Sequence, residues 1–290
     1  MKSNLIKNKD IVKVKIVGNE VVLHNINTCN TRATIKRIGN GQHINMRTGE
    51  IVTETKQVKR GDSLYSLLES NLRLQDLIKE NTVNTDHILL STLTYANKIL
   101  DIRKVNEDFK VFIKYLRRNI VEYGNIEYIN TAELHSDKSG YHLHAILFFN
   151  ESVKSVFIPM QTLLRAWQNG AISVGKPKTK QEVYCYLTPH LSNEVTDKNS
   201  HMHHKALLQM ELPAGQNLYR YSKGIRKPVI QTDTYGNVQR YLKANGYVFE
   251  REQIYPNPME TYKGNNLYYC RETYRKEDMP KQSSSKRTPI

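Results

Sequence analysis

The sequence predicts an α+β protein in which helices pack on an antiparallel sheet. Within residues 86–230, short apolar stretches and amphipathic segments follow one another in the order β-α-β-β-α-β-α. Two of the apolar stretches are separated only by the turn SDKSG, and a connection this short joins antiparallel strands. Apolar residues make up 39% of the 290 residues, which is enough for a core of this kind.

Each element of this core follows from a local pattern. The stretch HILLSTLTY is a candidate for a buried strand, and Asp101 is suited to cap a helix whose apolar residues recur every three to four positions. Pro159 suits the first turn of a second helix. Strands are therefore expected at 87–95, 126–135, 141–149 and 171–174, and helices at 101–119, 159–167 and about 179–191.

The residues outside this core divide into an accessory region, an extension and a tail. The N-terminal accessory region, 1–85, contains short strands within 11–58 and a helix at 62–80, whose leucines recur at helical spacing. Residues 231–274 are expected to extend the core. The polar and basic residues 275–290 are expected to form a disordered tail.

The charge balance indicates a polyanionic partner. Lysine and arginine number 43, aspartate and glutamate number 28, and the net charge is +15. Basic side chains displace counterions from phosphates, so a surplus of this size favours nucleic acid. The charge alone does not identify a function.

The same composition argues against several classes of protein. There is no apolar run of about 18 residues, the minimum for a membrane span, and the first residues lack the apolar region of a secretory signal. Cys29, Cys185 and Cys270 lie far apart without a CxxC pair, which argues against a disulfide framework and a zinc ribbon. These features predict a cytoplasmic protein that does not bind membranes.

The segment from Glu133 to His144 contains the residues best suited to chemistry. His142 and His144 are two positions apart in a predicted strand, so their imidazoles point to the same face. The SDKSG turn brings Glu133 opposite His142 to within about one residue. Two imidazoles and one carboxylate can bind a divalent ion and leave positions open for substrate oxygens.

Other histidines compete for this role. His135 shares the strand face of Glu133, but Glu133 is preferred because ions that act on phosphates favour oxygen ligands. The cluster HMHH at 201–204 lies in a polar stretch and is interpreted as a solvated loop.

Four segments occur in an order that is typical of a known family. They are LLSTLTY (89–95), HLHAILFF (142–149), VYCYLTPHL (183–191) and LYRYSKGIRKP (218–228). With them, the chain from about Leu67 to Pro228 resembles the rolling-circle replication initiators of plasmids and phages in low-GC bacteria, which are members of the HUH endonuclease superfamily. The segments are similar to that family's first motif, its metal motif, its tyrosine helix and a segment common after that helix.

The resemblance implies an enzyme that nicks and rejoins a specific origin strand through a tyrosine and a divalent metal, Mg²⁺ or Mn²⁺. His142 and His144 would be metal ligands, and Glu133 stands at the spacing of the third ligand. The partners would be DNA, as origin duplex and single strand. A host helicase and DNA polymerase would also be needed, because the sequence contains no P-loop motif. The oligomeric state is left open.

Tyr186 and Tyr184 are both candidates for the nucleophile. The residues YLT that begin at Tyr186 resemble part of the family's motif, which ranks Tyr186 first. The two tyrosines are about 200° apart around a helix, so only one of them is expected to face the metal. Many family members carry a lysine three or four residues after the tyrosine, and this chain does not. His190, one turn beyond Tyr186, is the candidate for the missing basic group.

Contacts to DNA phosphates are expected from two basic segments. Arg117 and Arg118 lie at the end of the predicted helix 101–119, and Lys223, Arg226 and Lys227 follow the tyrosine helix.

Three alternative functions remain open from the sequence. A nuclease that has decayed to a DNA-binding protein would explain the missing lysine. A relaxase or transposase of the same superfamily is a second alternative, although relaxases usually carry a third histidine where this chain has Leu147 or Phe148. An iron oxygenase would use the same two histidines and one carboxylate, but a net charge of +15 does not suit an enzyme of small molecules.

Overall fold

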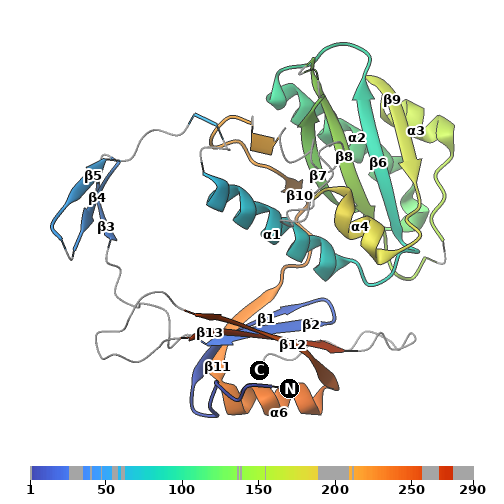
Figure 1. Cartoon of the computed structure of the whole chain (residues 1–290). Coiled ribbons are helices and arrows are strands. Elements are labelled where there is room, and N and C mark those ends of the chain that lie inside the picture. Colours follow the sequence, from blue (N-terminus) through green and yellow to red (C-terminus); the bar gives the residue numbers. More distant parts are fainter. Residues whose placement is uncertain are drawn as a thin grey trace. The chain divides into compact units, whose positions relative to one another are not determined.

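The chain forms two compact units, which are shown with their elements in Figure 1. The terminal unit consists of residues 1–56 and 228–290, and the central unit consists of residues 57–227. The computed structural model describes residues 2–25, 35–39, 41–46, 48–53, 58–59, 63–135, 137, 139–153, 155–188, 209–210, 212–256 and 268–276. The α+β class with antiparallel sheets is confirmed.

The central unit contains a five-stranded sheet in the order β10-β7-β8-β6-β9, and every neighbouring pair is antiparallel. Its strands are β6 (Ile88–Tyr95), β7 (Glu127–Leu134), β8 (Tyr141–Phe148), β9 (Gly170–Gly175) and β10 (Arg220–Tyr221). Its helices are α1 (Leu64–Asn81), α2 (Ile102–Asn119), α3 (Met160–Ala166) and α4 (Lys180–Tyr186), with a 3-10 turn at Val121–Tyr123.

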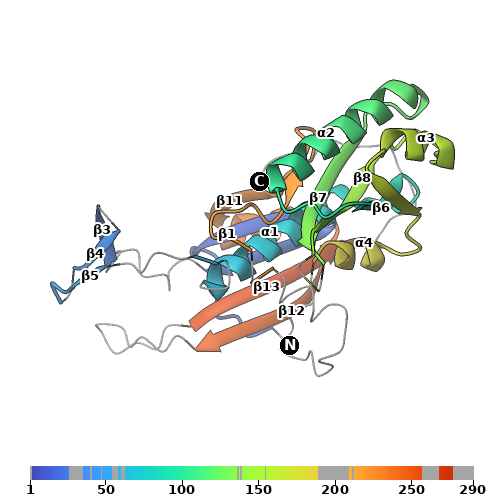
Figure 2. The same cartoon turned by 90° about the horizontal axis from the view of Figure 1, so that it is seen from above.

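Alternation along β8 gives this sheet two different faces. Leu143, Ala145 and Leu147 point to one face and pack in the core that includes residues of α2 and α3. Ile146 and Phe148 point to the other face and pack in a second core with residues of α1 and α4. Figure 2 shows α2 and α3 together on one side of the sheet and α4 on the other. We call the second face, to which His142 and His144 also belong, the α4 face.

The helices of the central unit begin at side-chain caps that the sequence supplies. Asp101 accepts a hydrogen bond from the backbone N–H of Arg103 at the start of α2, as predicted. Thr179 accepts one from the N–H of Glu182 at the start of α4. At the other end, α2 finishes in Arg117 and Arg118, whose charges suit the negative end of a helix dipole.

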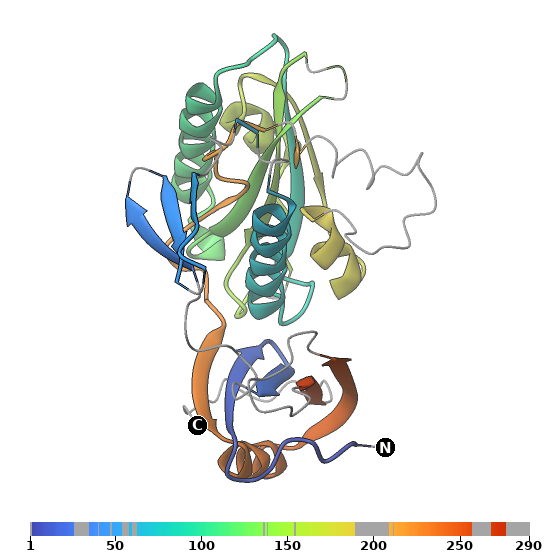
Figure 3. The same cartoon turned by 60° about the vertical axis from the view of Figure 1, so that its left-hand side comes forward.

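The terminal unit contains a second antiparallel sheet, in the order β11-β1-β2-β13-β12, and one helix that packs on it. The helix contributes Tyr235, Val238 and Leu242 to a core with Val14 and Leu23. Figure 3 shows this helix, α6, against the curved strands. The elements are β1 (Ile11–Val17), β2 (Glu20–Asn25), β11 (Val229–Thr234), α6 (Tyr235–Ala244), β12 (Tyr247–Pro256) and β13 (Tyr268–Lys276). A separate three-stranded sheet is formed by β3 (Ile35–Gly39), β4 (Gln42–Asn45) and β5 (Ile51–Thr53).

The observed division of the chain differs from the expected one. The helix expected in the accessory region, α1, packs in the core of the central unit through Leu74, Leu77 and Ile78. Residues 231–274, expected to extend that core, instead contribute β11, β12 and β13 to the terminal unit, where β11 pairs with β1 and β13 with β2. Pairing between distant segments leaves no local pattern, so the sequence did not reveal it. The expected tail begins inside β13, and its residues after Lys276 lie outside the described residues.

Among the described helices, none combines the length and the apolar character that a membrane-spanning segment needs.

Gly170, the first residue of β9, occupies a position that a side chain would not fit. Its φ is 154°, and a Cβ there would press on the carbonyl oxygen of Thr94 and lie 2.5 Å from the backbone nitrogen of Ala96. Both groups are already fixed, because the Trp167 indole N–H donates to the Thr94 oxygen and the Ala96 N–H donates to the Asn169 oxygen.

We therefore expect Gly170→Ala to lower the free energy of unfolding by roughly 1–3 kcal/mol, the usual cost of a strained backbone position. Gly175→Ala is the matched control, because it lies at the other end of β9 and a Cβ there would meet nothing within 4 Å. Urea unfolding followed by the fluorescence of the single tryptophan measures both variants. Equal stability of the two variants would contradict the explanation.

Candidate metal centre and tyrosine

A group of metal-ligating side chains lies on the α4 face of the central sheet. Antiparallel pairing of β7 with β8 brings Glu133 directly opposite His142, as the sequence predicted to within a residue. The Nε2 atoms of His142 and His144 are 2.9 Å apart, and Nε2 of His144 is 3.5 Å from a carboxylate oxygen of Glu133. The ligand atoms of these three residues all lie within 4.8 Å of one another, so together they can hold a metal ion.

The three residues suit a small divalent cation that acts on phosphates. Bonds of about 2.1 Å place neighbouring ligands of an octahedral ion about 3 Å apart, which is close to the separations of 2.9 and 3.5 Å seen here. The carboxylate supplies a hard oxygen ligand and a negative charge. Glu133 is 8% exposed and is oriented by the hydroxyl of Thr131, which donates to its other oxygen at 3.3 Å. The donor set therefore fits the predicted Mg²⁺ or Mn²⁺.

Tyr186 is held beside this group by α4. Val183 and Leu187, one turn apart on the helix, are fully buried in the core of the α4 face, and Tyr186 lies on the same side of the helix. Its hydroxyl is 2.9 Å from Oγ1 of Thr92 and 3.4 Å from Nδ1 of His144. The rings of His144 and Tyr186 meet edge to face, with 5.5 Å between their centroids.

Thr92 is a member of this site that sequence reasoning missed. It lies on β6 directly opposite His144, and its hydroxyl oxygen is 3.1 Å from Nδ1 of that histidine. Thr92 thus contacts both the histidine and the tyrosine. The signal was available, because Thr92 is part of LLSTLTY, but the sequence does not tell which polar residue of that strand faces the site.

The surroundings of Tyr186 disfavour its ionised form. Burial, with a smaller contribution from the negative charge of Glu133, raises the pKa of Tyr186 to about 12, while the hydrogen bond with Thr92 acts in the opposite direction. A phenol with this pKa is almost fully protonated near pH 7. A cation bound at Glu133, His142 and His144 would favour the phenolate.

The other tyrosine and the competing histidines have different positions. Tyr184 packs against the apolar core of the α4 face, and its carbonyl oxygen accepts a hydrogen bond from the Thr188 hydroxyl. The ring of His135 stacks on that of His142 at 4.5 Å between centroids. The expected helix 179–191 ends earlier than predicted, at Tyr186, shortly before Pro189. His190 and the HMHH cluster lie outside the described residues.

The basic residues proposed for phosphate contact differ in how far they are already engaged. The guanidinium of Arg117 donates to the Ile126 carbonyl oxygen, and that of Arg226 forms an ion pair with Glu151 and donates to the Glu80 carbonyl oxygen. Lys227 lies over the ring of Tyr221 at 5.8 Å. Arg118 and Lys223 are exposed. Arg117 and Arg226 therefore have structural contacts besides any contact with DNA.

A second group of possible ligands, in the terminal unit, is already satisfied within the protein. It consists of Glu252, Cys270 and Glu272. The Cys270 thiol donates to Glu252, and burial raises its pKa to about 12, so it stays protonated. The Glu272 carboxylate accepts hydrogen bonds from Tyr235 and Tyr274 and pairs with Lys2 at 3.0 Å. These contacts indicate a structural role.

The comparison with protein families gives one match, and it covers this site. Residues 88–195 match the model of a family described as Replication-associated protein ORF2. The matched residues run from β6 beyond α4 and include the three ligands and Tyr186. No curated protein and no solved structure shows significant similarity to the chain. The family match supports a role in DNA replication, and it is consistent with a replication initiator.

If the three residues bind a metal, Mn²⁺ should raise the melting temperature, and Glu133→Gln should abolish most of this shift. Loss of even an outer partner of a ligand weakens metal binding by about 10–100-fold, so loss of a charged ligand should cost at least as much. The control is Glu122→Gln, an exposed carboxylate of the same unit. A Glu133→Gln variant that keeps the full Mn²⁺ shift would show that the ion binds elsewhere.

Proposed function

We propose that this protein is a rolling-circle replication initiator of the HUH endonuclease superfamily, which nicks and rejoins one strand of a DNA origin. The observation that carries the proposal is the position of the Tyr186 hydroxyl, 3.4 Å from Nδ1 of His144, whose Nε2 belongs to the group of metal ligands. A phenol beside such a group is the arrangement needed for transfer of a phosphodiester to tyrosine. The family match over the same residues supports replication as the process involved.

In the proposed reaction, the phenol oxygen of Tyr186 attacks the phosphorus of one phosphodiester. A bond forms between this oxygen and the phosphorus, and the bond from the phosphorus to the 3′ oxygen breaks. The phenol loses its proton, and the departing 3′ oxygen gains one. The products are a 5′-phosphotyrosine and a free 3′-hydroxyl that can prime synthesis. Attack by a 3′-hydroxyl on the phosphotyrosine reverses the step, so rejoining needs no ATP.

The metal ligands and Thr92 would contribute in different ways. A divalent cation at this site would polarise the scissile phosphate and offset its charge. If His144 binds that cation through Nε2, its Nδ1 carries the proton and donates to Thr92, which is 3.1 Å away. The Thr92 hydroxyl is then oriented to donate to the Tyr186 oxygen at 2.9 Å. This chain of hydrogen bonds favours the phenolate that attacks.

The remaining steps of initiation need other surfaces and other proteins. Exposed Arg118 and Lys223 are candidates for contacts with DNA phosphates, together with Arg117, Arg226 and Lys227. Unwinding and synthesis would depend on a host helicase and DNA polymerase, because the sequence has no P-loop motif.

The nucleophile can be tested with a matched pair of variants. Tyr186→Phe removes one oxygen and keeps the ring, so the protein should bind Mn²⁺ and single-stranded DNA but form no covalent adduct. Tyr184→Phe should retain most of the activity. Labelled single-stranded origin DNA is incubated with Mn²⁺, and adducts are detected on a denaturing gel and mapped by mass spectrometry.

Three outcomes of this experiment would change the proposal. An adduct on Tyr184 would reverse the assignment of the nucleophile and keep the reaction. Cleavage without any covalent intermediate in the double variant would indicate a hydrolytic nuclease. Origin binding by the wild-type protein without cleavage would favour the decayed, non-enzymatic alternative that the missing lysine suggests.

His142→Ala or His144→Ala should abolish nicking and leave the affinity for duplex DNA nearly unchanged, because phosphate contacts elsewhere supply that affinity. Nicking is followed on supercoiled plasmid carrying the origin, and duplex binding by fluorescence anisotropy without metal. Full nicking by the double histidine variant would disprove the metal site.

Thr92→Val should slow adduct formation and move its rise with pH to higher pH. The Thr92 hydrogen bond lowers the pKa of Tyr186, so its removal raises that pKa and leaves less phenolate at any given pH. Thr92→Ser keeps the hydroxyl and should restore the wild-type profile. Rates of adduct formation between pH 6 and pH 9, values we choose to span roughly the range of general acid–base chemistry, would decide the point. An unchanged profile in Thr92→Val would exclude this role.

A further inference from the structure

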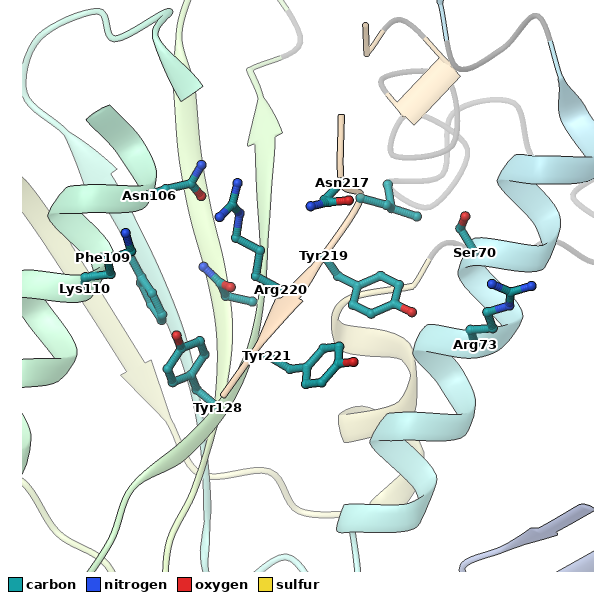
Figure 4. Close-up of a pocket in the computed structure, with 12 residues that line it drawn as sticks. Ser70, Arg73, Asn106, Phe109, Lys110, Tyr128, Asn217, Tyr219, Arg220 and Tyr221 are labelled. Carbon is teal, nitrogen blue, oxygen red and sulfur yellow. The ribbon is translucent and has the colours of Figure 1, made fainter. Parts of the chain in front are cut away.

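A cavity of about 490 Å³ lies at the β10 edge of the central sheet, and the candidate metal centre does not account for it. Figure 4 shows it between α1, α2 and the two edge strands β7 and β10. Its lining consists of Ser70, Arg73, Asn106, Phe109, Lys110, Tyr128, Asn130, Asn217, Leu218, Tyr219, Arg220 and Tyr221. The volume is within the range of cavities that hold small molecules.

The lining is cationic. Arg73, Lys110 and Arg220 contribute positive charges, and no carboxylate of the described residues lines the cavity. Arg73 and Lys110 form ion pairs with Glu69 and Glu107, but these are exposed pairs within single helices and therefore weak. Arg220 forms no ion pair with any described residue. In Figure 4 its side chain extends from β10 toward Asn106 on α2. The charge of the cavity therefore favours an anionic ligand.

The cavity also contains amide groups next to Arg220. Asn130 is the direct cross-strand neighbour of Arg220, so the two side chains share one face of the sheet. Asn130 is only 2% exposed, and its side-chain oxygen accepts no hydrogen bond from the described residues. A buried polar atom in this state is costly unless a ligand or water satisfies it. Asparagine amides bind the edges of nucleobases through paired donors and acceptors.

Three tyrosine rings complete the lining. Tyr219 and Tyr221 are nearly parallel, with 6.2 Å between their centroids, and Figure 4 shows both on the side of β10 that faces α1. Tyr128, on β7, packs edge to face against Phe109. Tyrosine faces are suitable platforms for stacked bases, and each base stacked in this way contributes about 1–3 kcal/mol.

We infer that this cavity binds one nucleotide, with its base against the tyrosine rings and the amides and its phosphate at Arg220. The combination of cations, aromatic rings and an amide oxygen without a partner among the described residues matches a ligand that is both anionic and aromatic. The nucleotide can belong to a DNA strand or be a free mononucleotide, because both present the same groups.

The position of the cavity favours a DNA strand, and this part of the inference rests on the proposed function. Asn130 and Glu133 are three residues apart on β7, which corresponds to about 10 Å along the strand. Tyr221 is paired with Ile129, so its ring lies on the α4 face, which also carries the metal ligands. A strand that leaves the metal ligands across β7 would therefore reach the tyrosines at the sheet edge.

The test compares Arg220→Gln with Arg165→Gln. Both variants remove one exposed positive charge from the central unit, but Arg165 is on α3 and does not line the cavity. Affinity for a fluorescent single-stranded oligonucleotide is measured by anisotropy on the full chain with EDTA, so that cleavage plays no part. Arg220→Gln should weaken binding by about tenfold, the lower end of the cost of losing one arginine contact, and Arg165→Gln should have little effect.

Photo-crosslinking locates the bound nucleotide. An oligonucleotide that contains 5-iododeoxyuridine is irradiated with the wild-type protein, and the crosslinked peptides are identified by mass spectrometry. Crosslinks are expected at Tyr128, Tyr219 or Tyr221. Equal affinities of the two arginine variants, together with crosslinks only outside the cavity, would overturn the inference.

Competition distinguishes the two sources of the nucleotide. If dAMP or dTMP displaces the oligonucleotide only at far higher concentrations than an unlabelled oligonucleotide, the natural ligand is a strand. Displacement at similar concentrations, lost in Arg220→Gln, would identify a mononucleotide site. Failure of the proposed nicking reaction is seen separately, as a wild-type protein that binds the oligonucleotide but forms no adduct with Mn²⁺.

Discussion

The register between β7 and β8 is the constraint on which the candidate site depends. With Glu133 opposite His142, the carboxylate and the two imidazoles lie on one face of the sheet. A shift of one residue would turn the side chains of one strand to the opposite face and separate them. The same register directs Leu143, Ala145 and Leu147 into the core with α2 and α3, so hydrophobic burial keeps the ligands together. The free energy that stabilises the fold thus also fixes the geometry of the site.

A second consequence of this register is the link between the ligands and the tyrosine. Val183 and Leu187 hold α4 on the same face as the histidines because they are buried in its core. His144 lies at the centre of the resulting arrangement, since one ring nitrogen meets Glu133 and His142 and the other meets Thr92 and Tyr186. A change of packing under α4 would therefore move the phenol relative to the ligands without altering any ligand.

The sequence predicted those features that depend on neighbours along the chain. The cap at Asp101, the hairpin from Glu133 to His142 and the extents of β6, β7 and β8 all follow from local patterns and a short turn. It did not reveal that β1 and β2 pair with β11 and β13, or that α1 belongs to the central unit, because these contacts join segments far apart in sequence. The cavity at β10 escaped notice for the same reason, since its lining comes from four separate segments. Thr92 was missed because several polar residues of its strand were equivalent until the pairing with β8 was known.

The two units differ in how their chain is assembled, and this difference has a consequence for folding. The terminal unit joins residues 1–56 to residues 228–290, whereas the central unit is one continuous segment. During synthesis the central unit can therefore complete its core before the last strands have left the ribosome. The strands β1 and β2 have to wait for β11 and β13 and remain without these partners in the meantime. Strand edges exposed in this way invite aggregation, so the early folding of the central unit also brings the two ends of the unfinished sheet closer together and shortens the search for their pairing.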